Sequence, residues 1–282
     1  MSALGEAIIA RSIDAMRIED QHGNRWQYHS RSDRHSKIAC WAVLFDVMRS
    51  CELLREHVTA GKVGFGINHE LHDFKQNRKK NLDLVVAKPS TDPAKSLTFA
   101  EYGKQMQVCL SDAEAAELAN LPVLRAAAVS NVLVALEAKA CMTEHQKARP
   151  RLFDELASSF QTIHGDTNSA IAAAFVMINC ADSFVSPDRN RKKVRAGKYV
   201  LNPHKQPAAA NGTLEKVMQL PRRSDEREHG FDALGVTMVN CPNDGTSVSV
   251  ATGMNGLVDK IVTYPSLIQR VSHLYSTKFR GL

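Results

Sequence analysis

Two hydrophobic segments of this chain carry charged residues whose types could bind a metal ion. Asp83 lies near the start of residues 81–86, and Glu137 and Lys139 lie near the end of residues 132–139. Both segments are rich in β-branched and aliphatic residues, which predicts two buried strands. Charged side chains in a buried strand are costly unless they have a partner or a role.

The spacing of these residues indicates how they would meet. Glu137 and Lys139 are two positions apart, so a strand places both side chains on the same face. If the two strands are neighbours, Asp83 adds a second carboxylate beside the single ammonium group. Such a group suits a divalent ion such as Mg²⁺, which prefers oxygen ligands and often binds one or two carboxylates, several waters and a phosphate.

The order Asp83, then Glu137-Ala138-Lys139 at the end of a hydrophobic strand, resembles the active-site signature of the PD-(D/E)xK nuclease superfamily. Members of this superfamily have the restriction-endonuclease-like fold, and the resemblance covers residues from about 36 to 180. The chain departs from the pattern at Leu82, where the family often has proline. The long separation of Asp83 from Glu137 predicts an insertion between the two strands.

The resemblance implies metal-assisted hydrolysis of phosphodiester bonds. Asp83 and Glu137 would bind Mg²⁺, with Mn²⁺ as a substitute, and the main-chain carbonyl of Ala138 would be a further ligand. Lys139 would orient or activate the attacking water and stabilise charge on the phosphate. The alternative interpretation of Glu137 and Lys139 is a structural salt bridge at the end of a strand.

Further residues could complete such a site. Glu52 lies on the expected first helix, where nucleases of this kind often carry an additional acid, and Glu70 follows the first strand. Gln146, together with His145 and Arg149, could reach a phosphate from the start of the next helix, since helix N-termini favour anions. The alternative for Glu52 and Glu70 is an ordinary exposed acid.

The net charge of +6 favours a polyanionic partner without establishing one. We expect nucleic-acid contacts from Arg78, Lys79, Lys80, Arg149, Arg191, Lys192 and Lys193. The basic clusters are Arg78–Lys80, then Arg189, Arg191, Lys192, Lys193 and Arg195, and finally Arg222, Arg223 and Arg227. Basic clusters beside an acidic metal site are typical of a protein that holds and cuts a phosphate backbone, although each cluster alone could be a solvated loop.

Other features of the chain favour a cytoplasmic protein. There is no run of 18 apolar residues that would predict a membrane span, and we expect no secretory signal. The six cysteines are scattered without a Cys-x-x-Cys motif, which indicates reduced, buried thiols. His69, His72 and Asp73 are more typical of a polar loop than of a transition-metal site, because no second ligand pair at suitable spacing follows.

Hydrophobic periodicity predicts the elements that must position the site. The predicted core consists of a long helix over residues 36–57, a strand at 62–67, the Asp83 strand, the Glu137 strand, a helix from Pro150 to 164 and a strand at 170–180. A polar connection is expected at 69–80. Ser111 and Glu114 have the spacing of a capping box that starts a helix.

This element order, helix, strand, strand, strand, helix, strand, is the core order of the superfamily. We therefore expect an α/β protein with a restriction-endonuclease-like core, a mixed β-sheet flanked by helices. The chain would form one nuclease domain over residues 1–282, with the core at about 36–180, an insertion at about 89–130 and a C-terminal extension at about 186–282. Strands at 234–240 and 247–251 and a helix at 265–275 would lie in the extension.

The predicted function is a Mg²⁺-dependent endonuclease that cuts double-stranded DNA, most simply a type II restriction enzyme acting as a homodimer or higher homo-oligomer. One alternative is an activator-dependent antiviral effector nuclease of the same fold. A second is a catalytically inactive DNA-binding protein, and a third is a small-molecule enzyme in which Glu-x-Lys is a coincidence. RNA is not excluded as substrate, because the phosphate chemistry is the same.

Overall fold

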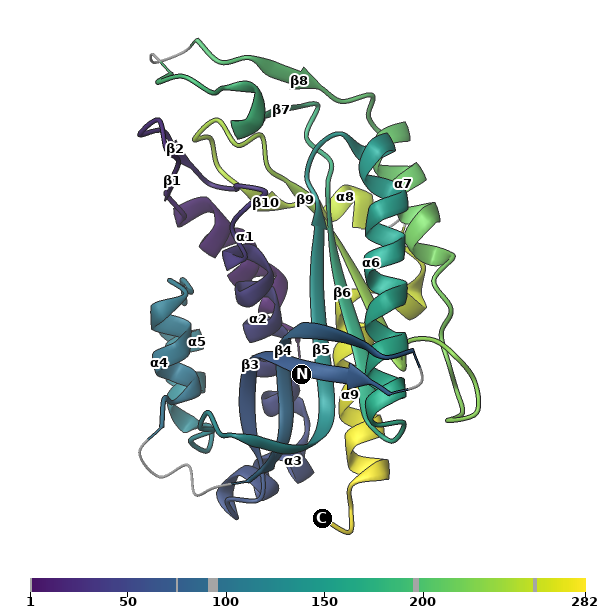
Figure 1. Cartoon of the computed structure of the whole chain (residues 1–282). Helices are drawn as coiled ribbons and strands as arrows, with labels where there is room; N and C mark the ends of the chain where they lie inside the picture. The colour runs from purple at the N-terminus through teal and green to yellow at the C-terminus, as the bar shows by residue number, and fades with distance from the viewer. Residues whose placement is uncertain (1, 75, 91–95, 195–197, 256–257) are drawn as a thin grey trace.

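The computed structural model describes residues 2–74, 76–90, 96–194, 198–255 and 258–282. Within them, a six-stranded mixed sheet has the strand order β10-β9-β6-β5-β4-β3 (Figure 1). The strands are β3 (Gly64–Asp73), β4 (Arg78–Pro89), β5 (Val129–Cys141), β6 (Ile171–Asn179), β9 (Ala233–Asn240) and β10 (Ser249–Val250). Strands β3, β4 and β5 are antiparallel, whereas β5, β6 and β9 are parallel. The α/β class and the mixed sheet are therefore confirmed.

Helices cover both faces of the sheet. On one face, α1 (Gly5–Ala15), α2 (Arg34–Ser50) and α9 (Tyr264–Lys278) pack in a single hydrophobic cluster with alternate residues of β4, β5 and β6. On the other face, α6 (His145–Asp166) and α7 (Ala208–Met218) form a second cluster with the intervening residues (Figure 1). Helix α2 is buried from Ser36 to Arg49, because the sheet, α1 and α9 surround it.

The remaining elements are short. Helices α4 (Phe99–Gln105) and α5 (Asp112–Asn120) lie in the predicted insertion, and both begin with a capping box. In α5 the box joins Ser111 and Glu114, as predicted. The other short elements are α3 (Glu52–Thr59), α8 (Thr252–Asn255), the pairs β1 (Ile18–Glu19) with β2 (Arg25–Trp26) and β7 (Ser183–Val185) with β8 (Leu201–Pro203), and the 3₁₀ turns at Pro187–Arg189 and Lys260–Val262.

The structure corrects three of the predicted elements. The long helix at 36–57 is two helices, because the backbone of Cys51 is extended between α2 and α3. The helix predicted to start at Pro150 starts at His145, and Pro150 lies inside it. The polar connection at 69–80 is wrong, since β3 continues to Asp73 and β4 begins at Arg78. The charged residues there belong to a hairpin whose side chains are partly in solvent, so a strand tolerates them.

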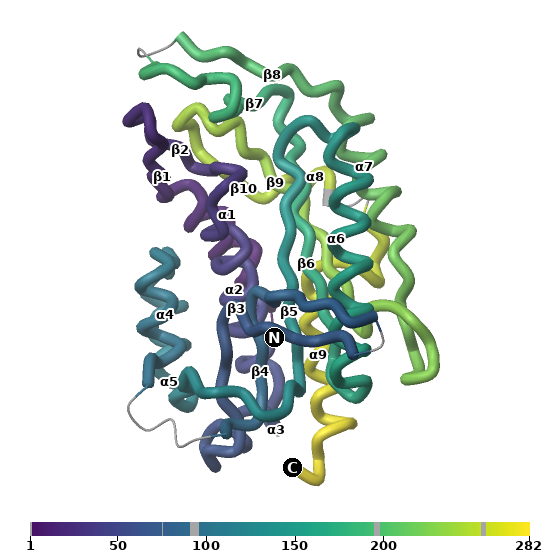
Figure 2. Tube along the Cα trace, in the orientation of Figure 1, coloured from purple at the N-terminus to yellow at the C-terminus, as the bar shows by residue number. Residues whose placement is uncertain are grey.

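This β3–β4 hairpin bends sharply in its middle. The pair Ile67–Leu84 is followed by His69–Leu82, so Asn68 and Asp83 interrupt the ladder, and Asn68 has a positive φ of 49°. Before the bend the hairpin belongs to the sheet; beyond it, the outer part contacts α6 (Figures 1 and 2). Asp83 therefore sits at the point where the hairpin leaves the sheet.

The sheet also uses strands from the predicted C-terminal extension. Strand β9 pairs in parallel with β6 along most of its length, and β10 adds a short edge. Helix α9 then packs against α2 on the face of the sheet that α1 and α2 cover. No helix among the residues described here is long and apolar enough to cross a membrane.

Candidate active site

Asp83 is held by three protein donors from two other elements. Its Oδ1 atom accepts hydrogen bonds from Ser36 Oγ and Lys37 Nζ, each at 3.1 Å. Its Oδ2 atom accepts a bond of 3.1 Å from the backbone N–H of Ala138. The bend in β4 thus joins the carboxylate to the first turns of α2 and to the middle of β5.

Glu137 lies next to this group. The pair Leu84–Leu136 of the antiparallel β4–β5 ladder directly precedes the position where Asp83 faces Glu137. The Glu137 side chain is 2% exposed, and burial raises its pKa, against the attraction of Lys139. The nearby charge of Asp83 raises this pKa further. The two acids are therefore close enough to act on one another electrostatically.

The two oxygens of Glu137 differ in their surroundings. Oε1 lies 2.9 Å from Lys139 Nζ and 3.8 Å from Lys80 Nζ. Oε2 is buried and has no hydrogen-bond partner among the described residues. A buried carboxylate oxygen without a partner is costly, which makes it a natural ligand for a cation.

Lys139 connects the acids to the other face of the sheet. Its ammonium group lies 3.5 Å from Glu155 Oε2 on α6 as well as beside Glu137. Burial acts to lower the pKa of Lys139, but Glu137 and Asp83 outweigh burial and raise it. Lys139 is therefore positively charged at neutral pH and fixed in position.

These groups border a cavity of about 420 Å³ between the start of α2, the end of β5 and α6. Asp83, Ala138 and Lys139 line it, whereas Glu137 is not part of its lining and lies buried beside Lys139. His35 also lines the cavity; burial lowers its pKa to about 4, so its ring is neutral at pH 7. Further lining residues are Tyr28, Ser30, Arg31, Ser32, Asp33, Ser36, Ala140, Cys141, Met142, Thr143, Ala148, Arg151, Leu152 and Glu155.

The donor set fits one hard divalent cation. The described part of the chain holds no group of three or more His, Cys, Asp or Glu side chains suited to a metal. A Mg²⁺ site needs fewer, because waters and substrate phosphate complete the coordination. Among the described residues, Glu137 Oε2 has no protein donor. Asp83 Oδ2 accepts a hydrogen bond from the backbone N–H of Ala138. The Ala138 carbonyl as a third ligand stays a prediction.

The structure does not bring the three additional candidates to this cavity. Glu52 is exposed and begins α3, beyond the end of α2 that lies away from Asp83. Glu70 is 54% exposed and pairs with Lys79 at 2.7 Å across the hairpin. Gln146 lines a neighbouring cavity at the start of α6.

The predicted nucleic-acid contacts separate into different environments. Arg78 pairs with buried Asp73, and Lys80 donates to the carbonyl of Glu155 and faces Glu137, so both support the fold around α6. Lys192 and Lys193 are exposed, and Arg195 lies outside the described residues.

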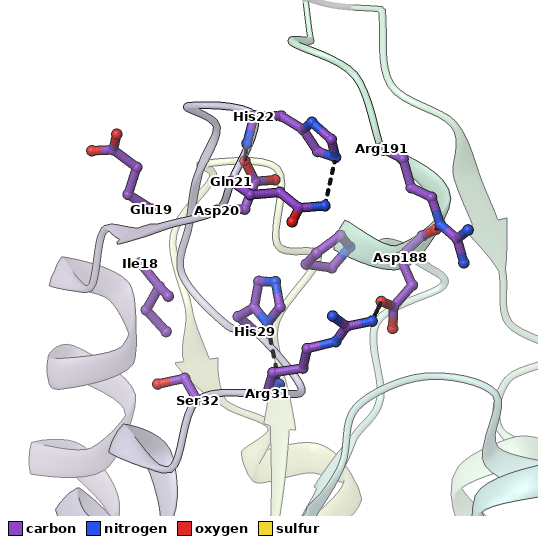
Figure 3. Close-up of a pocket in the computed structure, with 11 residues that line it drawn as sticks. Ile18, Glu19, Asp20, Gln21, His22, His29, Arg31, Ser32, Asp188 and Arg191 are labelled. Carbon is purple, nitrogen blue, oxygen red and sulfur yellow. Dashed lines mark hydrogen bonds and ion pairs between the residues drawn. The ribbon is translucent and has the colours of Figure 1, made fainter.

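A polar cavity of about 420 Å³ adjoins the site and shares Arg31 and Ser32 with it (Figure 3). Arg31 lies 3.6 Å from Asp188 across this cavity, and Arg191 borders its far side (Figure 3). Of the second basic cluster, Arg191 thus borders a space next to the cavity that Asp83 and Lys139 line.

Sequence reasoning missed the two α2 residues that hold Asp83. Lys37 is 3% exposed and lies among the buried residues of the helix. Its ammonium group bonds Asp83 and the side chain of Asn68, the residue opposite Asp83 at the bend. A lysine inside an otherwise buried helix is the feature that could have indicated this role, since buried lysines need a partner.

We compared the chain with protein-family models, with curated proteins and with solved structures, and found no match in any of the three.

Proposed function

We propose that this protein is a metal-dependent nuclease that hydrolyses phosphodiester bonds. The observation that carries the proposal is that Asp83 and Lys139 line one cavity while Glu137 lies buried 2.9 Å from Lys139, with its Oε2 atom free of partners among the described residues. Two acids and a charged lysine beside a water-accessible cavity are the groups that this hydrolysis requires.

Each residue has a role in the proposed reaction. Asp83 and Glu137 would hold Mg²⁺ or Mn²⁺, which supplies positive charge to the phosphate and acidifies a bound water. Lys139, fixed between Glu137 and Glu155, would orient the attacking water and stabilise charge on the phosphate. Ser36 and Lys37 would keep Asp83 in place.

The finer proposal is a type II restriction endonuclease that acts on double-stranded DNA as a homodimer or higher homo-oligomer. The restriction-endonuclease-like fold is supported by the element order α2, β3, β4, β5, α6, β6. The net charge of +6 supports a polyanionic substrate. All six cysteines are unpaired, which supports action in a reducing compartment such as the cytoplasm.

The deciding experiment is incubation of the purified protein with plasmid and phage DNA, with and without Mg²⁺. Glu137→Gln and Lys139→Met serve as site variants, and Glu70→Gln is the matched control because its carboxylate lies outside the cavity. We expect Mg²⁺-dependent cutting that both site variants lose and the control keeps. Cutting that survives in both site variants would refute the site.

The cleavage pattern distinguishes the forms of the proposal. Discrete fragments support a restriction enzyme, whereas smearing, or activity only after addition of an activator, supports the antiviral effector nuclease. A specific observation favours a further candidate, an inactive DNA-binding protein: Lys37 already neutralises Asp83. That candidate predicts DNA binding without cutting in either Mg²⁺ or Mn²⁺.

A further inference from the structure

A second cavity, of about 340 Å³, lies beside the catalytic cavity, and Thr143 lines both. It is formed by the start of α6, the segment around β8 and the start of α7. Three cationic side chains border it, namely Lys147, Arg149 and Lys205. The acid in its lining is Glu144, which is paired with Lys147 and with Arg189. The cavity therefore has an excess of positive charge next to the proposed reaction centre.

Arg149 is held rigidly at this cavity. Its Nε atom donates to Thr213 Oγ1 at 3.3 Å, and Nη2 donates to the carbonyl of Ala209 at 3.0 Å. Both partners are neutral, and Arg149 has no ion-pair partner in the part of the chain that the structure describes. A fixed guanidinium without an acid is a ready site for an anion, since its planar donors match phosphate geometry.

Helix α7 makes room for this guanidinium through Gly212. A Cβ atom at residue 212 would lie 2.5 Å from Arg149 Nη2 and 2.6 Å from Nη1, so a larger residue there would push the guanidinium aside. Glycine inside a helix is unfavourable relative to alanine. The space that Gly212 leaves is thus filled by the charged group of Arg149, and the two residues form one structural unit.

We propose that this cavity, with Arg149 at its centre, binds a backbone phosphate of the substrate next to the phosphate that is cut. The inference rests on the proposed nuclease function and adds a subsite to it. Thr143 lines both cavities, so they are adjacent, and a strand that reaches Lys139 would pass Arg149. A contact to phosphate does not distinguish one base from another. It would therefore add binding affinity and fix the position of the protein along the duplex without a sequence preference.

The first test measures DNA binding without cutting. Binding of a fluorescent duplex is followed by anisotropy in Ca²⁺ over a range of salt concentrations, for the wild type and Arg149→Ala. Loss of one phosphate contact should weaken binding about tenfold and lower the slope of log K against log salt by about 0.9. Gly212→Ala displaces the guanidinium without removing its charge, so it should weaken binding by less. Arg280→Ala is the control, because Arg280 is exposed and lies two residues after the end of α9.

The second test locates the contact. A duplex that spans a mapped cut is made with a single neutral methylphosphonate at each position in turn. Wild-type binding should fall at one phosphate adjacent to the cut, and Arg149→Ala should show no further loss there. Equal sensitivity of both proteins at every position, or an unchanged salt slope, would overturn the subsite. If the wild type binds but never cuts, the nuclease proposal fails while the salt slope still decides whether Arg149 contacts phosphate.

Discussion

Replacing Lys37 by methionine removes the cation that balances Asp83 while it keeps a side chain of similar length. The pair is 3.1 Å apart, with side chains 3% and 15% exposed. Breaking a buried pair by removing one partner costs about 3–5 kcal/mol, because a charge is left without compensation. Asp83 keeps its bonds from Ser36 and Ala138, so we expect a loss near the lower limit, about 3 kcal/mol in EDTA.

A divalent ion bound at Asp83 and Glu137 should replace the missing charge. A ligand at 100 times its Kd stabilises a folded protein by about 2.7 kcal/mol. Mg²⁺ should therefore restore most of the stability of Lys37→Met and add less to the wild type, in which the ammonium group competes with the metal. Urea unfolding of both proteins in EDTA and in Mg²⁺ measures the four free energies.

The control is Lys79→Met, which breaks the exposed pair with Glu70 and should cost less than about 1 kcal/mol with or without Mg²⁺. A Lys37→Met deficit of the same size in EDTA and in Mg²⁺ would refute the reasoning, because the cation would then not reach Asp83. A deficit below about 1 kcal/mol would show that the Lys37–Asp83 pair contributes little.

Three further predictions concern the scaffold. Burial lowers the pKa of His145 from 6.5 to about 4. Above pH 6.5 the ring is neutral in both the folded and the unfolded chain, so the shift has no effect there; as the pH falls toward 4, the unfolded chain binds the proton first and the folded protein loses about 3 kcal/mol of stability. His145→Gln should therefore reduce the fall in unfolding free energy measured by urea titration between pH 7 and 4.5. Arg223→Met leaves buried Asp232 without its guanidinium partner and should cost about 3–5 kcal/mol of unfolding free energy. Adding Asp232→Asn should recover part of this loss, and a double variant less stable than the single one would contradict the pairing. In Gly235→Ala the new Cβ would lie 2.7 Å from Leu267 Cδ2, so α9 must shift. We expect the unfolding free energy to fall by about 1–3 kcal/mol, measured by thermal unfolding. An unchanged melting temperature would contradict this.

The core strands were predictable because their sequences carry local information. The aliphatic runs around Asp83 and Glu137 are long enough to identify buried strands, and two-residue periodicity placed Glu137 and Lys139 on one face. The structure confirms these strands and brings Asp83 beside them. Their use as a metal site stays a prediction.

The hairpin extension and the role of Lys37 were not predictable in the same way. Leu71 and Phe74 are the only apolar residues in the sequence from 69 to 80, so composition alone indicates a loop. The role of Lys37 depends on its contact with Asp83, which lies 46 positions away in the chain. Arg149 likewise depends on Gly212, since only the fold brings α6 and α7 together.

The packing of α9 against α2 has a consequence during synthesis. Tyr264 donates to Asp46, Ser272 bonds Ser50 and Tyr275 bonds His57, so α9 holds α2, which carries Lys37, and α3. A ribosome makes these tyrosines after every residue proposed to act on the phosphate. Until they emerge, α2 lacks the helix that packs against it beside α1 and the sheet. The contacts that α9 makes with α2 and α3 would therefore form only after α9 has left the ribosome.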